Sequence, residues 1–218
     1  MLSRDALRSG AFFTLFQNVP GMEGWSRERI EHSMRETLAH RPDDSPVWLF
    51  AYGSLIWNPL FHFVESCPAQ LDGWRRSFCI RMLAGRGSVE RCGRMMSLVQ
   101  GGCTQGLALR LDETQLETEL TLVWSREMVG GAYRPDWATI TLADGRAAPA
   151  IIFMANPDSA LHEPDDSIDT VAPLIAAAEG PLGSNRDYVL QLDTILRRHG
   201  IEDAYVRTLA QRLKSRSP

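Results

Sequence analysis

The sequence of 218 residues predicts an α+β fold, in which a small mixed β-barrel or sheet is flanked by helices. Three observations support this class. Many apolar segments have the length of short strands, one helical segment is inserted among them, and the C-terminal tail is helical in pattern. Hydrophobic residues make up 44% of the chain and charged residues 23%, which is ordinary for a globular protein with one good-sized core.

Residues 1–46 are predicted to form a helical N-terminal extension and linker, and residues 47–218 the main domain with a helical C-terminal tail. Ser26 is suited to cap a helix that begins at Arg27 and continues to about His40. The segment 41–46, Arg-Pro-Asp-Asp-Ser-Pro, has the prolines and acidic residues that are typical of a linker.

The main domain is expected to begin with a buried strand. The apolar run at 47–52 is closed by Gly53 and Ser54, which predicts a strand that enters a tight loop. A helix is expected from residue 111 to about residue 126. Further strands are expected at 60–65, 76–81, 95–99, 104–111, 137–142 and 150–154, and further helices at about 167–178, 186–199 and 203–214.

The composition argues against several classes of function. A net charge of -4 and a pI of about 5.7 disfavour an extended nucleic-acid interface, and no apolar run approaches the roughly 18 residues that span a bilayer. The start of the chain lacks the layout of a signal peptide, so we expect a soluble cytoplasmic protein with four reduced cysteines. Neither the cysteines nor the five histidines have metal-ligand spacing, so we expect no metal and no cofactor.

The turn after the first strand is one candidate site. Residues 49–55 read L-F-A-Y-G-S-L. Gly53 lets backbone amides approach a ligand closely, while Ser54 adds a hydroxyl group and Tyr52 a phenol. The same residues are also compatible with an ordinary strand-to-turn connection. A serine-hydrolase elbow is not indicated, because the G-x-S-x-G pattern is absent.

Glu127 is the candidate acid/base. Leu116, Leu120, Val123 and Glu127 are spaced by four, three and four residues, so a helix places them on one face. At the end of this apolar stripe, burial and the negative end of the helix dipole both favour the neutral carboxylic acid, which suits proton transfer near neutral pH. A Gly-Gly pair follows and leaves room for a substrate. The alternative is that Glu127 is the first exposed residue beyond the core, paired with a neighbouring arginine.

Arginine is concentrated between residues 75 and 94, where Glu90 is the one acid. Such a cluster is suited to capture an anionic small molecule, or it forms a solvated loop in an arginine-rich protein. The cluster consists of Arg75, Arg76, Arg81, Arg86, Arg91 and Arg94.

Taken in order, several segments resemble the ChaC-type γ-glutamylcyclotransferase family. They include the opening strand with Y-G-S-L-I-W, a strand with paired arginines, and an R-E segment followed by Gly-Gly-Ala-Tyr. The matching segments lie at 47–57, 73–78, 93–99, 106–111, 126–133 and 180–189. Each is weakly diagnostic alone, but the ordered set is specific and extends from about residue 47 to residue 213.

The resemblance implies that residues 47–218 form a γ-glutamylcyclotransferase-like catalytic domain. It implies cleavage of glutathione, or of a related γ-glutamyl compound, by internal cyclisation to 5-oxoproline and Cys-Gly, with Glu127 as acid/base. No metal, cofactor, nucleic acid or membrane is required, and the oligomeric state stays open. The implied substrate-binding residues are Leu49, Phe50, Ala51, Tyr52, Gly53, Ser54, Leu55, Arg76, Tyr133 and Tyr188.

Three alternatives stay open: a serine amidase that uses Ser54, a non-catalytic binding or regulatory protein of the same fold, and a cyclotransferase for other γ-glutamyl amines or amino acids. The sequence also departs from the family pattern. Two residues separate Glu127 from the Gly-Gly pair where the family often has one. The segment 156–164 lacks the tyrosine and glycine of the family's N-P-x-Y-L-G-P loop. We expect this loop to lie near the substrate, which leaves the substrate's identity open.

Overall fold

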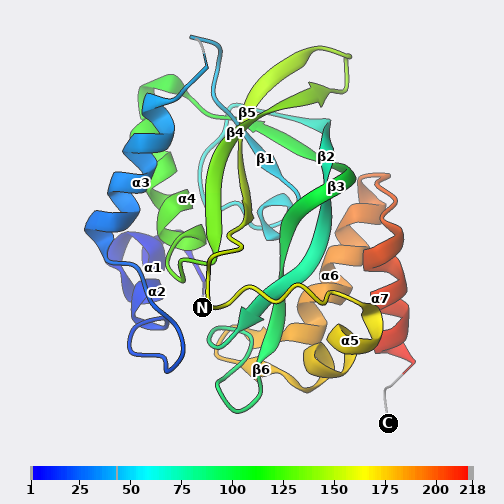
Figure 1. Cartoon of the computed structure of the whole chain (residues 1–218). Coiled ribbons are helices and arrows are strands. Elements are labelled where there is room, and N and C mark those ends of the chain that lie inside the picture. The colour runs from blue at the N-terminus through cyan, green and yellow to red at the C-terminus, as the bar shows by residue number, and fades with distance from the viewer. Residues whose placement is uncertain (1, 43, 216–218) are drawn as a thin grey trace.

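The computed structural model describes residues 2–42 and 44–215 (Figure 1). Its centre is a closed five-stranded barrel with the strand order β1-β3-β2-β4-β5, which confirms the α+β class. Strand β1 closes the barrel by pairing antiparallel to β3 and parallel to β5. The strands are β1 (Trp48–Ala51), β2 (Glu65–Met82), β3 (Gly93–Arg110), β4 (Tyr133–Leu142) and β5 (Ala147–Ala155), with a small second sheet of β6 (Glu179–Gly180) and β7 (Gly183–Ser184).

The barrel strands are longer than the sequence patterns predicted. The predicted strand 76–81 is one part of β2, while 95–99 and 104–111 belong to the single strand β3, which continues through Gly101 and Gly102. The predicted strand 60–65 is wrong. Leu60 has a positive φ of 59°, which breaks an extended conformation, and β2 begins only at Glu65.

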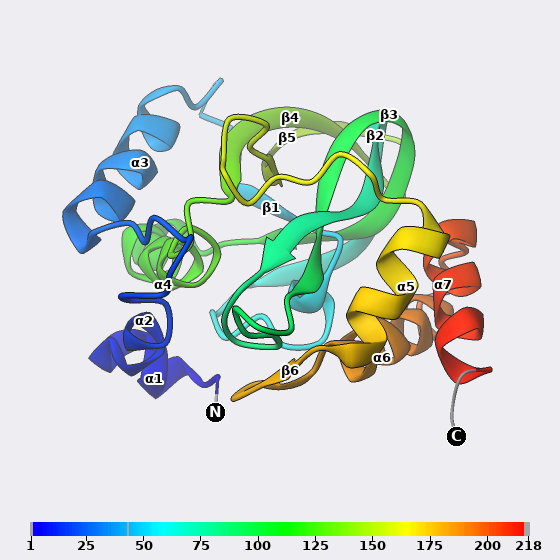
Figure 2. The same cartoon turned by 60° about the horizontal axis from the view of Figure 1, so that its bottom comes forward.

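Helices cover the barrel on two opposite sides (Figures 1 and 2). On one side, α1 (Arg4–Ser9), α2 (Ala11–Thr14) and α3 (Arg27–Ala39) pack against α4 (Leu116–Glu127). The N-cap of α3 was predicted correctly, because the Ser26 hydroxyl accepts a hydrogen bond from the amide of Arg29 at 3.2 Å. The short helices α1 and α2 were not predicted. The expected linker at 41–46 is irregular where it is described, and Asp43 lies outside the described residues.

The predicted central helix is observed as a 3-10 turn, η2 (Glu113–Gln115), followed by α4. Leu120 and Val123 are buried, as the apolar stripe required. The other side of the barrel is covered by α5 (Ile168–Ala177), α6 (Asn185–Arg198) and α7 (Ala204–Lys214), close to the three helices predicted for the tail. Within the described ranges, no helix combines the length and the apolar character needed to cross a membrane. All four cysteines are described and are free thiols.

Candidate functional site

A cavity of about 610 Å³ opens where several parts of the chain meet. One wall is the turn after β1, which contains the 3-10 helix η1 (Ser54–Ile56), and another is the C-terminal end of α4. The loop between β2 and β3 forms a third wall, and the N-terminal segment contributes Phe12, Phe16 and Met22. The turn after β1 and the end of α4, which were both predicted as candidate sites, therefore share this cavity with the N-terminal segment, for which no role was predicted.

Glu127 is the last residue of α4, and its side chain reaches this cavity with 15% of its surface exposed. Burial raises the pKa of Glu127 above the ordinary value for glutamate, while the charge of Arg126 acts in the opposite direction. The chain turns directly after the helix at Gly131, whose φ is 63°. A β-carbon there would lie 2.4 Å from Nε1 of Trp25, so the turn needs glycine. The predicted carboxylate at the end of an apolar stripe is thus observed.

Arg126 connects the helix end to the turn after β1. Its Nε lies 3.1 Å from Oε1 of Glu127, and its Nη2 donates a hydrogen bond to the Ser54 hydroxyl at 2.6 Å. Its Nη1 donates to the carbonyl of Asn58. Arg126 was not among the predicted site residues. The sequence showed only its adjacency to Glu127, since the Ser54 partner lies 72 residues away.

The turn after β1 presents backbone donors. Ile56, Trp57 and Asn58 use their amides in local hydrogen bonds to Gly53 and Ser54 carbonyls. Among the residues that the structure describes, the preceding amides, those of residues 53–55, have no backbone acceptor. They are therefore available to a carboxylate or an oxyanion.

Three tyrosines complete the polar part of the cavity. The Tyr52 hydroxyl donates to the Phe153 carbonyl at 2.5 Å, and the Tyr133 hydroxyl donates to the Met96 carbonyl at 2.9 Å. Burial, and next the charge of Glu127, raise the pKa of Tyr188 to about 12. Burial likewise raises the pKa of Tyr52 and Tyr133 well above the usual value. All three phenols therefore stay protonated near neutral pH.

Six of the ten predicted substrate-binding residues line the cavity, and four do not. Leu49, Phe50 and Ala51 belong to β1, where they pair with β3 and their side chains are fully buried. Those that line the cavity are Tyr52, Gly53, Ser54, Leu55, Tyr133 and Tyr188.

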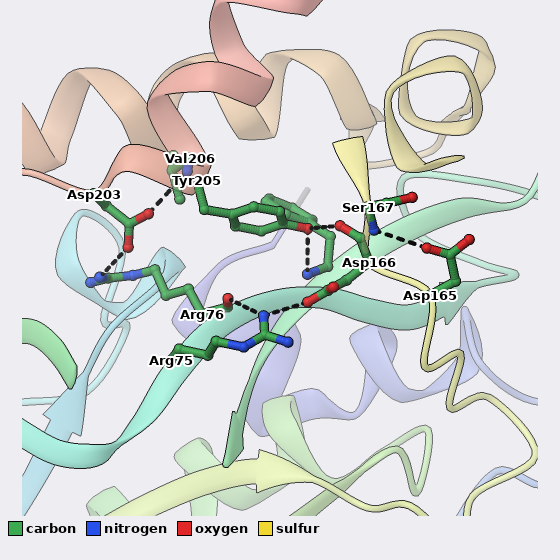
Figure 3. A network of polar contacts seen from close by, with 9 residues as sticks. Arg75, Arg76, Asp165, Asp166, Ser167, Asp203, Tyr205 and Val206 are labelled. Atoms are coloured by element: carbon green, nitrogen blue, oxygen red, sulfur yellow. Dashed lines mark hydrogen bonds and ion pairs between the residues drawn. The ribbon is translucent and has the colours of Figure 1, made fainter. Parts of the chain in front are cut away.

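Arg76 is the fourth residue outside the cavity lining. Its side chain is 1% exposed, and its nitrogens donate to Asp203 and to the carbonyls of Tyr52 and Gln105. Figure 3 shows Arg76 extended toward Asp203 at the start of α7, beside the contact of Arg75 with Asp166. The nitrogens of this buried arginine are thus directed at protein acceptors, one of which is the Tyr52 carbonyl.

The arginine cluster at 75–94 is, as a whole, neither a single anion-binding site nor a solvated loop. Arg75 and Arg76 lie on β2 and are paired with acids, whereas Arg91 is exposed. Arg81 and Arg86 do line the cavity. The loop at 156–164 also reaches the cavity, through the buried side chain of Leu161.

Comparisons with known proteins show the family and the fold. The sequence model of one protein family, described as ChaC-like protein, matches residues 47–216. The glutathione-specific γ-glutamylcyclotransferase of Escherichia coli is 47% identical over 203 residues, covering 93% of this chain and 88% of that protein. Human glutathione-specific γ-glutamylcyclotransferase 1 is 30% identical over 154 residues, 69% of each chain. The crystal structure of a yeast γ-glutamyl cyclotransferase specific to glutathione superposes with a TM-score of 0.71 at 20% identity, covering 79% of this chain and 97% of that one, so it shares the fold.

Proposed function

The chain belongs to the ChaC-like family, and on that premise we propose that it is a γ-glutamylcyclotransferase that acts on glutathione. The reaction forms a bond between the α-amine nitrogen and the γ-amide carbon of the substrate. It breaks the bond from that carbon to the cysteine nitrogen, and it releases 5-oxoproline and Cys-Gly. This is amide cleavage of the lyase type, in which no water is added.

Glu127 carries the proton in this proposal. As a carboxylate it accepts one proton from the α-ammonium group before the attack and a second from the same nitrogen as the ring closes. It passes these protons in turn to the leaving nitrogen, which departs as an ammonium group. The observation that carries the proposal is a carboxyl group whose pKa is raised by burial, at the wall of a cavity that is also lined by the turn after β1. Because the attacking amine belongs to the substrate, much of the entropic barrier is overcome by folding the γ-glutamyl chain in place.

The turn after β1 is proposed to hold the negative charge. The amides of residues 53–55 are available for the substrate's α-carboxylate or for the oxyanion on the γ-carbonyl. Arg126 contacts both Ser54 and Glu127, so it holds the anion site and the proton carrier in a fixed position relative to each other. Tyr52, Tyr133 and Tyr188 surround them as protonated phenols.

A serine amidase is the main rival. Ser54 would need a histidine as general base, and no histidine lines the cavity within the described part of the chain. The Ser54 hydroxyl is instead held by Arg126, a cation that accepts no proton. Other γ-glutamyl substrates and a non-catalytic role remain alternatives that the following assay separates. We also place the enzyme in the cytoplasm, which is supported by its four free cysteines.

The test is an assay of the purified protein with glutathione and a panel of other γ-glutamyl compounds in ¹⁸O-labelled water. We expect glutathione to yield 5-oxoproline without incorporated label, because an internal cyclisation consumes no water. Free glutamate carrying one labelled oxygen would mean hydrolysis and would overturn the proposal. Binding of glutathione without any product would identify a non-catalytic member of the fold.

A further inference from the structure

Among the described residues, one cation in the cavity wall has no acidic partner within ion-pair distance. Three arginines line the cavity: Arg81, Arg86 and Arg126. Arg126 is paired with Glu127, and Arg81 lies 3.8 Å from a carboxylate oxygen of Glu163. Within the described residues, no carboxylate lies within ion-pair distance of Arg86, although Asp187 attracts it from farther away.

Arg86 is half-buried and held in place. Its Nη1 donates a hydrogen bond to the Ser184 carbonyl at 2.9 Å, and its guanidinium carbon lies 5.7 Å from the ring centroid of Tyr188. A guanidinium group has five N–H donors, so most of them stay available after the contact with Ser184. The group is thus oriented in advance for a planar anion such as a carboxylate.

The turn beside Arg86 packs against apolar side chains. The neighbouring turn at Gly85 packs so closely that a β-carbon would lie 3.2 Å from Leu182 and 3.6 Å from Phe16 of the N-terminal segment. A charge removed from water in such a place is costly unless an opposite charge meets it. Since no carboxylate of residues 2–42 and 44–215 forms an ion pair with Arg86, the position calls for a negative charge on the ligand.

Glutathione has two carboxylates, and in the proposed function the turn after β1 holds its γ-glutamyl end, through the α-carboxylate or the γ-carbonyl oxygen. Tyr188 lies between that turn and Arg86: its hydroxyl lies 3.2 Å from where a β-carbon would stand at Gly53, and the Arg86 guanidinium carbon lies 5.7 Å from its ring centroid. The Cys-Gly part of glutathione extends about 7 Å beyond the γ-carbonyl. A substrate held at the turn can therefore extend along Tyr188 and bring its second carboxylate toward Arg86.

The geometry points to Arg86 as the residue that binds the C-terminal carboxylate of the substrate. Building on the proposed function, it makes the enzyme select γ-glutamyl peptides whose leaving part ends in a free carboxylate. The N-terminal segment takes part through Phe16, which supports the turn that carries Arg86.

The test compares glutathione with its glycinamide analogue, which has the same length and thiol but lacks the terminal charge. Initial rates of 5-oxoproline formation give kcat/KM for each compound. We expect the wild type to prefer glutathione by about 10- to 100-fold, the range for a lost hydrogen bond to a charged group. Arg86→Gln should remove this preference by slowing glutathione alone, and Arg86→Lys should retain part of it. Arg91→Gln is the matched control, because Arg91 is exposed in the same loop.

Two results would overturn the inference and leave the proposed function intact. One is a wild type that cyclises both compounds equally well, which needs no variant. The other is an Arg86→Gln enzyme that loses the same factor on both compounds, which would assign Arg86 to the γ-glutamyl end. If the wild type yields no 5-oxoproline from either compound, the proposed function itself fails. Thermal unfolding of each variant shows whether a lost preference comes from a folded protein.

Discussion

Helix α4 carries two glutamates whose pKa values are shifted in opposite directions: that of Glu119 is lowered and that of Glu127 is raised. Glu119 accepts hydrogen bonds from both terminal nitrogens of Arg4 at 2.6 Å and from the amide of His62 at 2.8 Å. Burial acts to raise the pKa of Glu119, but the hydrogen bonds from Arg4 and His62 lower it below the ordinary value. The polar contact that the structure gives for Glu127 is its ion pair with Arg126. The effect of burial exceeds that of the Arg126 charge, so the pKa of Glu127 is raised.

The difference shows that burial alone does not prepare a carboxylate for proton transfer. Both glutamates are mostly withdrawn from water, with side chains 3% and 15% exposed. What separates them is the number of donors directed at their oxygens. Glu119 has donors on both oxygens and is a structural anion, which ties the N-terminal segment and the loop before β2 to α4. Glu127 has open acceptor positions that a substrate ammonium group can occupy.

The largest expected effect comes from removing Glu127, the carboxylate that has fewer donors. Glu127→Gln should lower kcat by about 10²–10⁴-fold, because proton transfer in both directions is lost while size and shape are kept. Production of 5-oxoproline from glutathione measures the loss. The matched control is Glu117→Gln, at an exposed position of the same helix, which should turn over normally. Activity of Glu127→Gln within a few-fold of wild type would remove Glu127 from the mechanism.

These two glutamates also mark what the sequence reveals and what it hides. The position of Glu127 follows from the spacing of its own helix and from the Gly-Gly pair, which are local features. Nothing in the helix distinguishes Glu119 as a buried anion, because its partner Arg4 lies 115 residues earlier. Arg126 escaped for the same reason, since its contact with Ser54 joins two distant segments.

The fold likewise has parts that local sequence patterns predict and parts that they do not. Helix α3 follows from a cap and a short-range pattern, so its bounds were predicted almost correctly. The parallel pairing of β1 with β5 that closes the barrel joins residues about a hundred positions apart and has no local pattern. Helices α1 and α2 are too short to show a period, and their apolar residues become meaningful only through contact with α4 and the cavity.

The second effect is on stability. Glu119→Gln should lower the free energy of unfolding by about 3 kcal/mol, because it leaves Arg4 partly buried without its counter-charge. Urea denaturation measures this change, and Glu117→Gln should stay within about 0.5 kcal/mol of wild type. The ion pair stabilises the fold above the ordinary pKa of glutamate, and this stabilisation is lost as the pH falls through the lowered pKa of Glu119. An unchanged unfolding free energy would show that this ion pair contributes nothing to stability.

The smallest effect has the opposite sign and concerns the stability of Glu127→Gln. A carboxyl group whose pKa is raised in the folded state destabilises that state once the pH exceeds its unfolded value of 4.5, and this cost grows until the folded pKa is passed. Glutamine carries no charge and avoids the cost, so the inactive variant should unfold at a higher temperature than wild type near pH 7. Each kcal/mol gained corresponds to about 2–4 °C in a chain of this size. The difference should vanish near pH 4, where glutamate is protonated in both states.

A Glu127→Gln protein that loses as much stability at pH 7 as Glu119→Gln would mean that Glu127 is a second structural anion, and the contrast along α4 would not exist. The expected result would instead show that the active site keeps its proton carrier at the expense of stability.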